Sequence, residues 1–125
     1  DRPLKGIAVI DLSTFLGLAD VALGTFEPKP TSVEGNQREA SRVLWSSPDG
    51  RLEIGVWECT PGRFTADRSQ AAEFCHLLSG TVEMRHADGR VEHLGPGDAL
   101  ILPKGWKGEW VLTGQTRKIY AFYRG

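Results

Sequence analysis

Short runs of alternating or mostly apolar residues recur along the chain from residue 51 onward, and glycine or proline residues separate them. These runs predict β-strands because they are rich in β-branched and aromatic residues and many of them alternate in polarity. The seven runs are residues 51–60, 73–80, 81–86, 90–95, 98–103, 108–113 and 118–123. Seven short strands between turns indicate an all-β sandwich or barrel.

One hairpin can be placed from its turn residues. Ala87-Asp88-Gly89 lies between the runs 81–86 and 90–95. An Asp-Gly pair is typical of a type I′ turn, in which both central residues take a positive φ. We therefore expect a hairpin here, with this turn at its tip.

The N-terminal third has a different pattern. Residues 13–22 favour one or two helical turns with Ser13 as the N-cap, although Gly17 lowers the helix propensity. Residues 27–40 are rich in Pro, Glu and Gly and predict a loop. We divide the chain into an N-terminal arm, residues 1–42, which contributes a short helix and strand, and a barrel, residues 43–125.

Length and charge narrow the functional classes. A chain of 125 residues suits one domain, and 15 basic against 16 acidic residues give a formal charge of -1. No run of Lys or Arg forms a phosphate-binding stripe, so we expect no nucleic-acid partner. The apolar segment 6–24 is interrupted by Asp11 and Asp20 and lacks a cationic start, so it predicts neither a membrane span nor a signal peptide. We expect a cytoplasmic protein with no membrane partner.

The two cysteines, Cys59 and Cys75, are too few for a disulfide framework and lack C-x-x-C spacing. We expect a reduced pair of small apolar residues, and a single disulfide stays open as the alternative.

Four segments together resemble a known family. They are WECTPGRF at 57–64, EFCHLLSGTVEM at 73–84, DGRVEHLGPGDALILPKGWKGEW at 88–110 and RKIYAF at 117–122. In this order and spacing the chain is similar, over residues 43–123, to the small single-domain cupins grouped with the (S)-ureidoglycine aminohydrolase cupin domain and the ethanolamine-utilisation cupin. The resemblance implies an RmlC-like fold, a double-stranded β-helix or jelly-roll barrel.

The resemblance also implies where a metal site would lie. Metal-binding cupins take two histidines and a glutamate from the first motif and one histidine from the second. Glu73 matches the glutamate, but the first-motif histidine positions fall near Arg68 and Gln70, or on residues 66–69 when counted back from Glu73. The second-motif position falls on Gly108.

A single carboxylate holds a transition ion poorly, because such sites combine several imidazole, carboxylate or thiolate ligands. We therefore expect no metal and no other cofactor. The alternative is a divalent metal held by Glu73 with Asp67, Gln70 or Cys75.

Strand alternation places Glu73, Cys75 and Leu77 on one face, which the resemblance assigns to the barrel interior. A buried carboxylate needs a cation or several donors. The donors that we expect are Trp106, Trp110, Lys118 and Tyr120. These residues predict a metal-free pocket.

In this pocket Glu73 acts as a general base or hydrogen-bond anchor, and Tyr120 and Lys118 are further acid/base candidates. Cys75, Trp106 and Trp110 line the pocket. The alternative is a purely structural Glu73 that one such partner holds.

The three histidines carry less weight. His76 shares a face with Phe74 and Leu78, opposite to Glu73, and we interpret it as a packed histidine. His86 and His93 lie on either side of the Asp-Gly turn, and we expect both to face solvent.

The apolar face of Phe74 and Leu78 requires a cover, either arm residues 7–24 or a second subunit. We expect a homodimer.

The expected function is a small-molecule-binding cupin whose ligand is a small polar or anionic metabolite. Two alternatives stay open. One is a metal-dependent enzyme of the aminohydrolase or oxygenase kind, and the other is a non-catalytic sensing or interaction module. Whether any reaction is catalysed does not follow from these residues, because one fold carries many functions.

Overall fold

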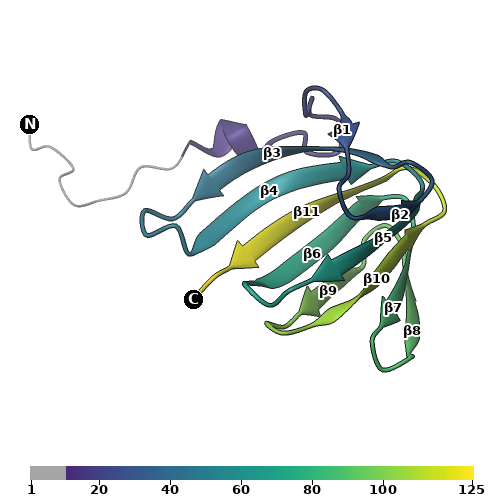
Figure 1. Cartoon of the computed structure of the whole chain (residues 1–125). Coiled ribbons are helices and arrows are strands. Elements are labelled where there is room, and N and C mark those ends of the chain that lie inside the picture. The colour runs from purple at the N-terminus through teal and green to yellow at the C-terminus, as the bar shows by residue number, and fades with distance from the viewer. Residues whose placement is uncertain (1–10) are drawn as a thin grey trace, which may run out of the picture.

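Two antiparallel sheets face one another in this computed structural model, which describes residues 11–125 (Figure 1). The strands are β1 (Glu27–Pro28), β2 (Ser32–Glu34), β3 (Arg38–Ser46), β4 (Leu52–Cys59), β5 (Gly62–Asp67), β6 (Ala72–Ser79), β7 (Val82–His86), β8 (Val91–Leu94), β9 (Ala99–Leu102), β10 (Lys107–Leu112) and β11 (Thr116–Tyr123). The six-stranded sheet has the order β1-β3-β4-β11-β6-β9, and the five-stranded sheet has the order β2-β5-β10-β7-β8. The all-β prediction is confirmed.

All seven predicted runs are strands, and the structure adds β1, β2, β3 and β5. The boundary placed between residues 42 and 43 falls inside β3. The pairing of β3 with β4 shifts between Val43 and Trp45. Because a bulge breaks the alternation of a strand, β3 lacked the sequence pattern by which the seven predicted strands were found.

The arm contains less helix than we predicted. A single 3-10 turn, η1 (Leu12–Phe15), replaces the helix expected over residues 13–22. Its N-cap is Asp11, whose carboxylate accepts a hydrogen bond from the Ser13 backbone N–H at 3.0 Å. The turn ends at Leu16, which takes an extended conformation, and Gly17 then has a φ of +63°. The part of the arm expectation that falls on residues 1–10 lies outside the described residues.

No helix within residues 11–125 has the length and apolar character that crossing a bilayer requires. The cytoplasmic location stays a prediction.

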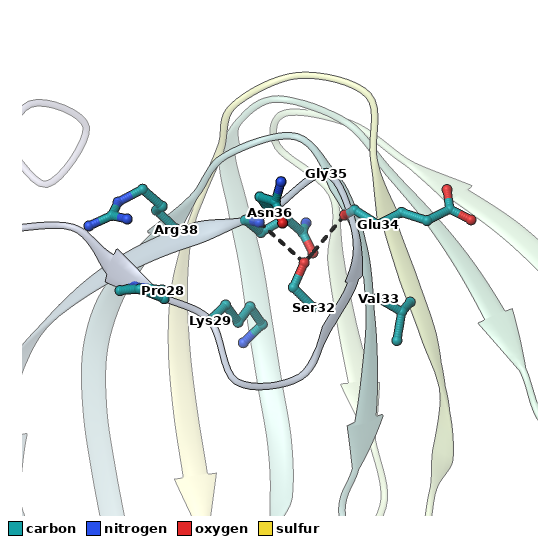
Figure 2. Close-up of a pocket in the computed structure, with 9 residues that line it drawn as sticks. Pro28, Lys29, Ser32, Val33, Glu34, Gly35, Asn36 and Arg38 are labelled. Carbon is teal, nitrogen blue, oxygen red and sulfur yellow. Dashed lines mark hydrogen bonds between the residues drawn. The ribbon is translucent and has the colours of Figure 1, made fainter.

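The arm returns to the barrel through a tight turn between β2 and β3 (Figure 2). Gln37 is buried, accepts a hydrogen bond from Ser32 Oγ at 2.9 Å, and donates one to the Thr60 carbonyl at 3.2 Å. A cavity of about 370 Å³ lies beside this turn. Because Ser32 and Gln37 are hydrogen-bonded to one another there, they stabilise the turn that brings Lys29 to the barrel.

The hairpin between β7 and β8 is confirmed, but its turn type is not the predicted one. Asn36 is the only non-glycine residue with a positive φ in the described chain, so Asp88 does not take the conformation that a type I′ turn requires. Gly89 has a φ of +94°, and its N–H donates to the His86 carbonyl at 3.0 Å. This geometry corresponds to a three-residue loop that ends on a left-handed glycine.

The outer face of the six-stranded sheet carries an apolar row. Register aligns Trp45 with Ile54, Ala121, Phe74 and Ile101 across β3, β4, β11, β6 and β9. Phe74 is 45% exposed and Ile101 is 62% exposed.

The arm covers another part of this face. Arg117 donates to the carbonyls of Leu18 and Val21 at 2.8 and 2.9 Å. The described part of the arm therefore leaves the row from Trp45 to Ile101 open.

Candidate functional site

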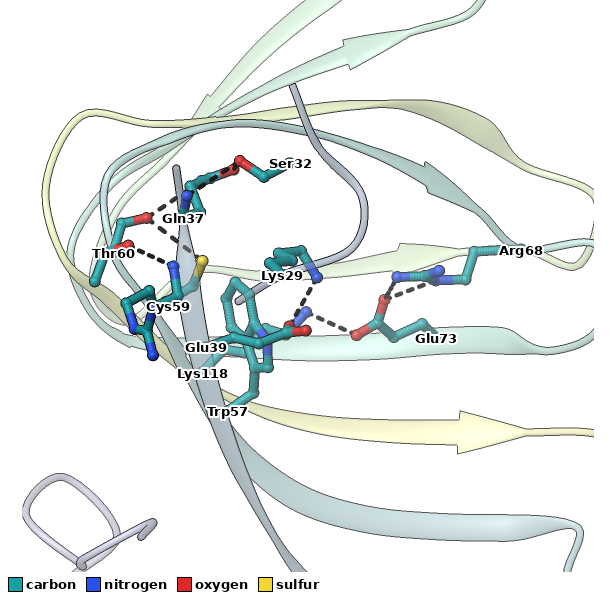
Figure 3. Close-up of polar contacts among 11 residues, drawn as sticks. Lys29, Ser32, Gln37, Glu39, Trp57, Cys59, Thr60, Arg68, Glu73 and Lys118 are labelled. Carbon is teal, nitrogen blue, oxygen red and sulfur yellow. Dashed lines mark hydrogen bonds and ion pairs between the residues drawn. The ribbon is translucent and has the colours of Figure 1, made fainter. Parts of the chain in front are cut away.

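Glu73 lies on the inner face of β6 and is completely buried, as strand alternation together with the cupin resemblance predicts. One carboxylate oxygen accepts a hydrogen bond from Arg68 Nε at 2.9 Å, and Arg68 Nη2 lies 2.7 Å from the same oxygen. The other oxygen accepts a hydrogen bond from Lys118 Nζ at 2.8 Å (Figure 3). Two cations therefore neutralise one buried carboxylate.

Lys118 reaches Glu73 from β11 and is itself buried. Its ammonium lies 4.4 Å from the ring centroid of Trp57 and 4.1 Å from that of Trp110. Aromatic faces attract a cation through their negative quadrupole, so both rings help to hold the charge. The indole N–H of Trp110, which we expected to reach Glu73, has no hydrogen-bond partner in the described residues.

The cations keep this carboxylate ionised. Burial alone would raise the pKa of Glu73, but the charges of Lys118 and Arg68 outweigh it and lower the pKa to about 2. Burial would likewise lower the pKa of Lys118, but Cys75 and Glu73 outweigh it and raise that pKa. Both groups are therefore charged at neutral pH.

A second ion pair comes from the arm. Lys29 Nζ lies 2.8 Å from Glu39 Oε1, and Trp57 Nε1 donates to the same oxygen at 2.8 Å. The Lys29 ammonium also lies 4.3 Å from the ring centroid of Phe64. The arm thus supplies one wall of the site (Figure 3).

Tyr120 belongs to a third polar pair. Its hydroxyl donates to Glu53 Oε2 at 2.8 Å, and burial together with this hydrogen bond raises the pKa of Tyr120. The phenol lies over Gly55, where a Cβ would stand only 2.5 Å from the hydroxyl oxygen. Tyr120 is therefore bound to Glu53, and not to Glu73 as we expected.

These groups surround one cavity of about 300 Å³. Its lining residues are Lys29, Glu39, Ser41, Glu53, Trp57, Phe64, Arg68, Glu73, Lys118, Tyr120 and Phe122. The structure brings the three acid/base candidates, Glu73, Lys118 and Tyr120, together at this cavity.

The expected pocket residues lie elsewhere. Cys75 is buried beside Glu73, and burial, the leading cause, raises its pKa to about 12. Trp110 lies beneath Lys118. Trp106 packs near Gly108 and donates from Nε1 to His86 Nδ1 at 2.9 Å. None of the three is among the residues that line the cavity.

The residues present do not fit a metal ion. Both Glu73 oxygens are engaged by Arg68 and Lys118. A Cβ at Gly108 would lie 2.6 Å from the Trp106 ring, so the indole takes the space that a second-motif histidine would need.

Asp67, the alternative ligand, accepts hydrogen bonds from Ser69. Gln70 is exposed. Residues 11–125 contain no group of three His, Cys, Asp or Glu side chains that would hold a metal.

The histidines follow the prediction only in part. His93 is solvent-facing, since its side chain is 73% exposed and lies 3.3 Å from Glu83. The prediction for His86 is wrong: its side chain is 12% exposed and lies between Trp106 and Glu92, 2.6 Å from the latter.

Four charged residues of the site were missing from the sequence prediction: Arg68, Lys29, Glu39 and Glu53. Arg68 carried a usable signal, because a permanently charged guanidinium stands at one of the positions where the resemblance places a histidine. The other three carried none: Lys29 and Glu39 pair with one another within the arm, and the partner of Glu53, Tyr120, comes from a distant strand.

Family and structure comparisons agree on the fold. The family model described as EutQ-like cupin domain matches residues 46–120. The structure of the Clostridium difficile EutQ protein is similar with a TM-score of 0.61 and 25% identity, covering 70% of this chain and 69% of that chain. A DUF861-family protein from Thermotoga maritima is 31% identical over 52% of this chain and 73% of its own, with a TM-score of 0.50. The predicted jelly roll is confirmed.

More distant structures share the fold alone. The polyketide cyclase RemF from Streptomyces resistomycificus is 21% identical, with a TM-score of 0.62, covering 81% of this chain and 74% of that chain. No curated protein matches the chain. The narrower likeness to the ureidoglycine aminohydrolase cupin domain stays a prediction.

Proposed function

We propose that this chain, a member of the EutQ-like cupin family, binds a small polar metabolite, without a metal, in the cavity beside Glu73. The observation that carries this proposal is the pairing of one buried carboxylate with Lys118 and Arg68 at the wall of a cavity. Two protein cations supply the positive charge that a metal would otherwise bring to this glutamate.

The protonation states favour binding over acid/base catalysis. A general acid or base works best when its pKa lies near the operating pH. The pKa of Glu73 is about 2, and those of Lys118 and Tyr120 are raised from values already above neutrality. In this proposal Glu73 is therefore an anchor that orients Arg68 and Lys118 toward the ligand.

The two alternatives relate to this site in different ways. A metal-dependent aminohydrolase-like or oxygenase-like enzyme would need ligands that the described residues do not assemble. A sensing module would use the same cavity without turnover, so the proposal includes it.

The test is a thermal-shift screen of small polar metabolites, followed by calorimetric titration of the hits. Ser41 on β3 lines the cavity and belongs to none of the ion pairs, so Ser41→Phe should obstruct the cavity and abolish each response, while Glu92→Gln on β8 should keep it. Hits that bind Ser41→Phe as well as wild type would overturn the proposed site.

A parallel measurement is plasma mass spectrometry of untagged protein purified without chelators. We expect less than about a tenth of an equivalent of any transition metal per chain, because the donor set is incomplete. A near-stoichiometric ion would overturn the metal-free part of the proposal.

A further inference from the structure

We propose that the ligand is a neutral, saturated molecule with several hydroxyl groups, of about the size of a monosaccharide. This inference rests on the proposed function and specifies the chemical class that the cavity accepts. It follows from the charges, the spare hydrogen-bonding groups and the aromatic faces of the lining.

The lining is balanced in charge. It holds three basic side chains, Lys29, Arg68 and Lys118, and three acidic ones, Glu39, Glu53 and Glu73. Every basic member is paired: Lys29 with Glu39 at 2.8 Å, and Lys118 and Arg68 with Glu73 at 2.8 and 2.7 Å. Glu53 lies 3.7 Å from Arg124, so each charged group of the lining already has a partner of opposite charge. A ligand with a net charge would lose its hydration and would have to compete with these pairs, which disfavours both anions and cations.

The same pairs still offer hydrogen bonds. Arg68 has five N–H groups. Its Nε and Nη2 atoms contact Glu73 and its Nη1 atom donates to the Asp67 carbonyl, which leaves two N–H groups for a ligand. Lys29 has three N–H groups, and one is directed at Glu39.

Acceptors stand beside these donors. The Glu39 contacts use Oε1 and leave the second oxygen free of described partners. A hydroxyl group both donates and accepts, so it is the group that matches an ammonium next to a carboxylate. Several hydroxyls on one molecule would satisfy Arg68, Lys29 and Glu39 together.

The aromatic residues are already engaged with cations. Lys29 and Lys118 lie against Trp57, Lys29 lies against Phe64, and Arg68 lies 5.3 Å from the Phe122 centroid. A planar aromatic ligand would have to displace these contacts in order to stack. A saturated ligand does not need to stack on the aromatic rings. The cavity volume of about 300 Å³ lies near the lower limit of ligand pockets, so the ligand is small.

Three probes with one carbon skeleton test the inference: sorbitol, which is neutral, gluconate, an anion, and glucamine, a cation. Affinities would be measured by saturation-transfer NMR and titration on the full chain. We expect sorbitol to bind at least about tenfold more tightly than either charged analogue, because each of these leaves a charge uncompensated. Ser41→Phe should abolish sorbitol binding, and Glu92→Gln should leave it unchanged.

The outcomes separate this inference from the proposed function. If gluconate or glucamine bound more tightly than sorbitol, and Ser41→Phe abolished that binding, the cavity would be the site and the neutral class would be wrong. If none of the three bound while the metabolite screen gave cavity-dependent hits, the inference would again fail alone. If the screen also gave no such hit, both proposals would fail.

Discussion

The guanidinium of Arg68 donates to the buried carboxylate of Glu73 at 2.9 Å, and Arg68 is one of the positions at which the resemblance to metal-binding cupins places a histidine. A histidine there would help a metal to compensate the glutamate, whereas an arginine supplies the compensating charge itself. Lys118 completes the charge from β11. Arg68 and Lys118 thus compensate the charge of Glu73 with side chains.

Replacing Glu73 by glutamine should lower the free energy of unfolding by about 3 kcal/mol, because Lys118 remains buried without its counter-charge. Urea denaturation of Glu73→Gln, Lys118→Met and the double variant measures this. The double variant should lose less than the sum of the single variants. Asp88→Asn, at the exposed pair of Asp88 and Arg90, is the control and should leave the free energy of unfolding almost unchanged. A Glu73→Gln loss as small as that of the control would contradict the prediction.

The same pair should give a defined pH dependence. The pKa of Glu73 falls from 4.5 to about 2 on folding, so the stability that it contributes is complete above about pH 4.5 and is lost as the pH falls toward 2. The difference in unfolding free energy between wild type and Glu73→Gln should therefore be constant from pH 5 to 8 and shrink below pH 4.5. Urea titrations across this range check it, and a difference that grows on acidification would contradict the assigned pKa shift.

How much of the site could be predicted depends on how far apart in the sequence the contacting residues lie. Alternation along β6 is local, and it grouped Glu73 with Cys75 and Leu77 on one face, which the resemblance assigned to the interior; all three are buried. Choosing Lys118 as the partner of Glu73 would have required the register of β6 against β11. In that register Lys118 aligns with Leu77 and Phe122 aligns with Glu73. Lys118 was named from the sequence as one of four candidates, and nothing local ranked it above Trp110 or Tyr120.

The missed residues share a physical reason. Lys29 reaches the cavity because the turn around Gly35 and Gln37 folds the arm onto the barrel, and no periodic pattern marks that turn. Trp106 was expected beside Glu73, but Gly108 leaves a space that its ring fills. Packing of this kind depends on three-dimensional volume, which a one-dimensional pattern does not contain.

That packing predicts a cost for any side chain at Gly108. Gly108→Ala should lower the free energy of unfolding by about 1–3 kcal/mol, because the new methyl group would press on the Trp106 ring and the Arg85 carbonyl. Gly114→Ala is the matched control, since nothing lies within 4 Å of its Cβ position. Thermal unfolding of both variants measures the difference. Equal stability of the two would show that the indole is not confined as described.

The exposed row from Trp45 to Ile101 supports the prediction of a homodimer. Phe74 and Ile101 stand side by side on β6 and β9, and exposed apolar patches of this kind mark interaction surfaces. Light scattering at micromolar concentration should give twice the mass of one chain, and Phe74→Asp should shift the protein to monomer. Val91→Asp, at a 49% exposed valine of the other sheet, should leave the mass unchanged. A monomeric wild type would refute the dimer.

The two cysteines should be unreactive in the folded protein. Both thiols are free and buried, and burial is the main cause that raises the pKa of Cys59 to about 11 and that of Cys75 to about 12. Because only the thiolate attacks a disulfide reagent, neither residue should react with DTNB at pH 8 within minutes, while both should react in guanidinium. Cys75→Ser then identifies which thiol reacts first as the protein opens. Rapid labelling of the native protein would mean that the interior beside Glu73 is accessible, and would reopen Cys75 as a lining residue of the cavity.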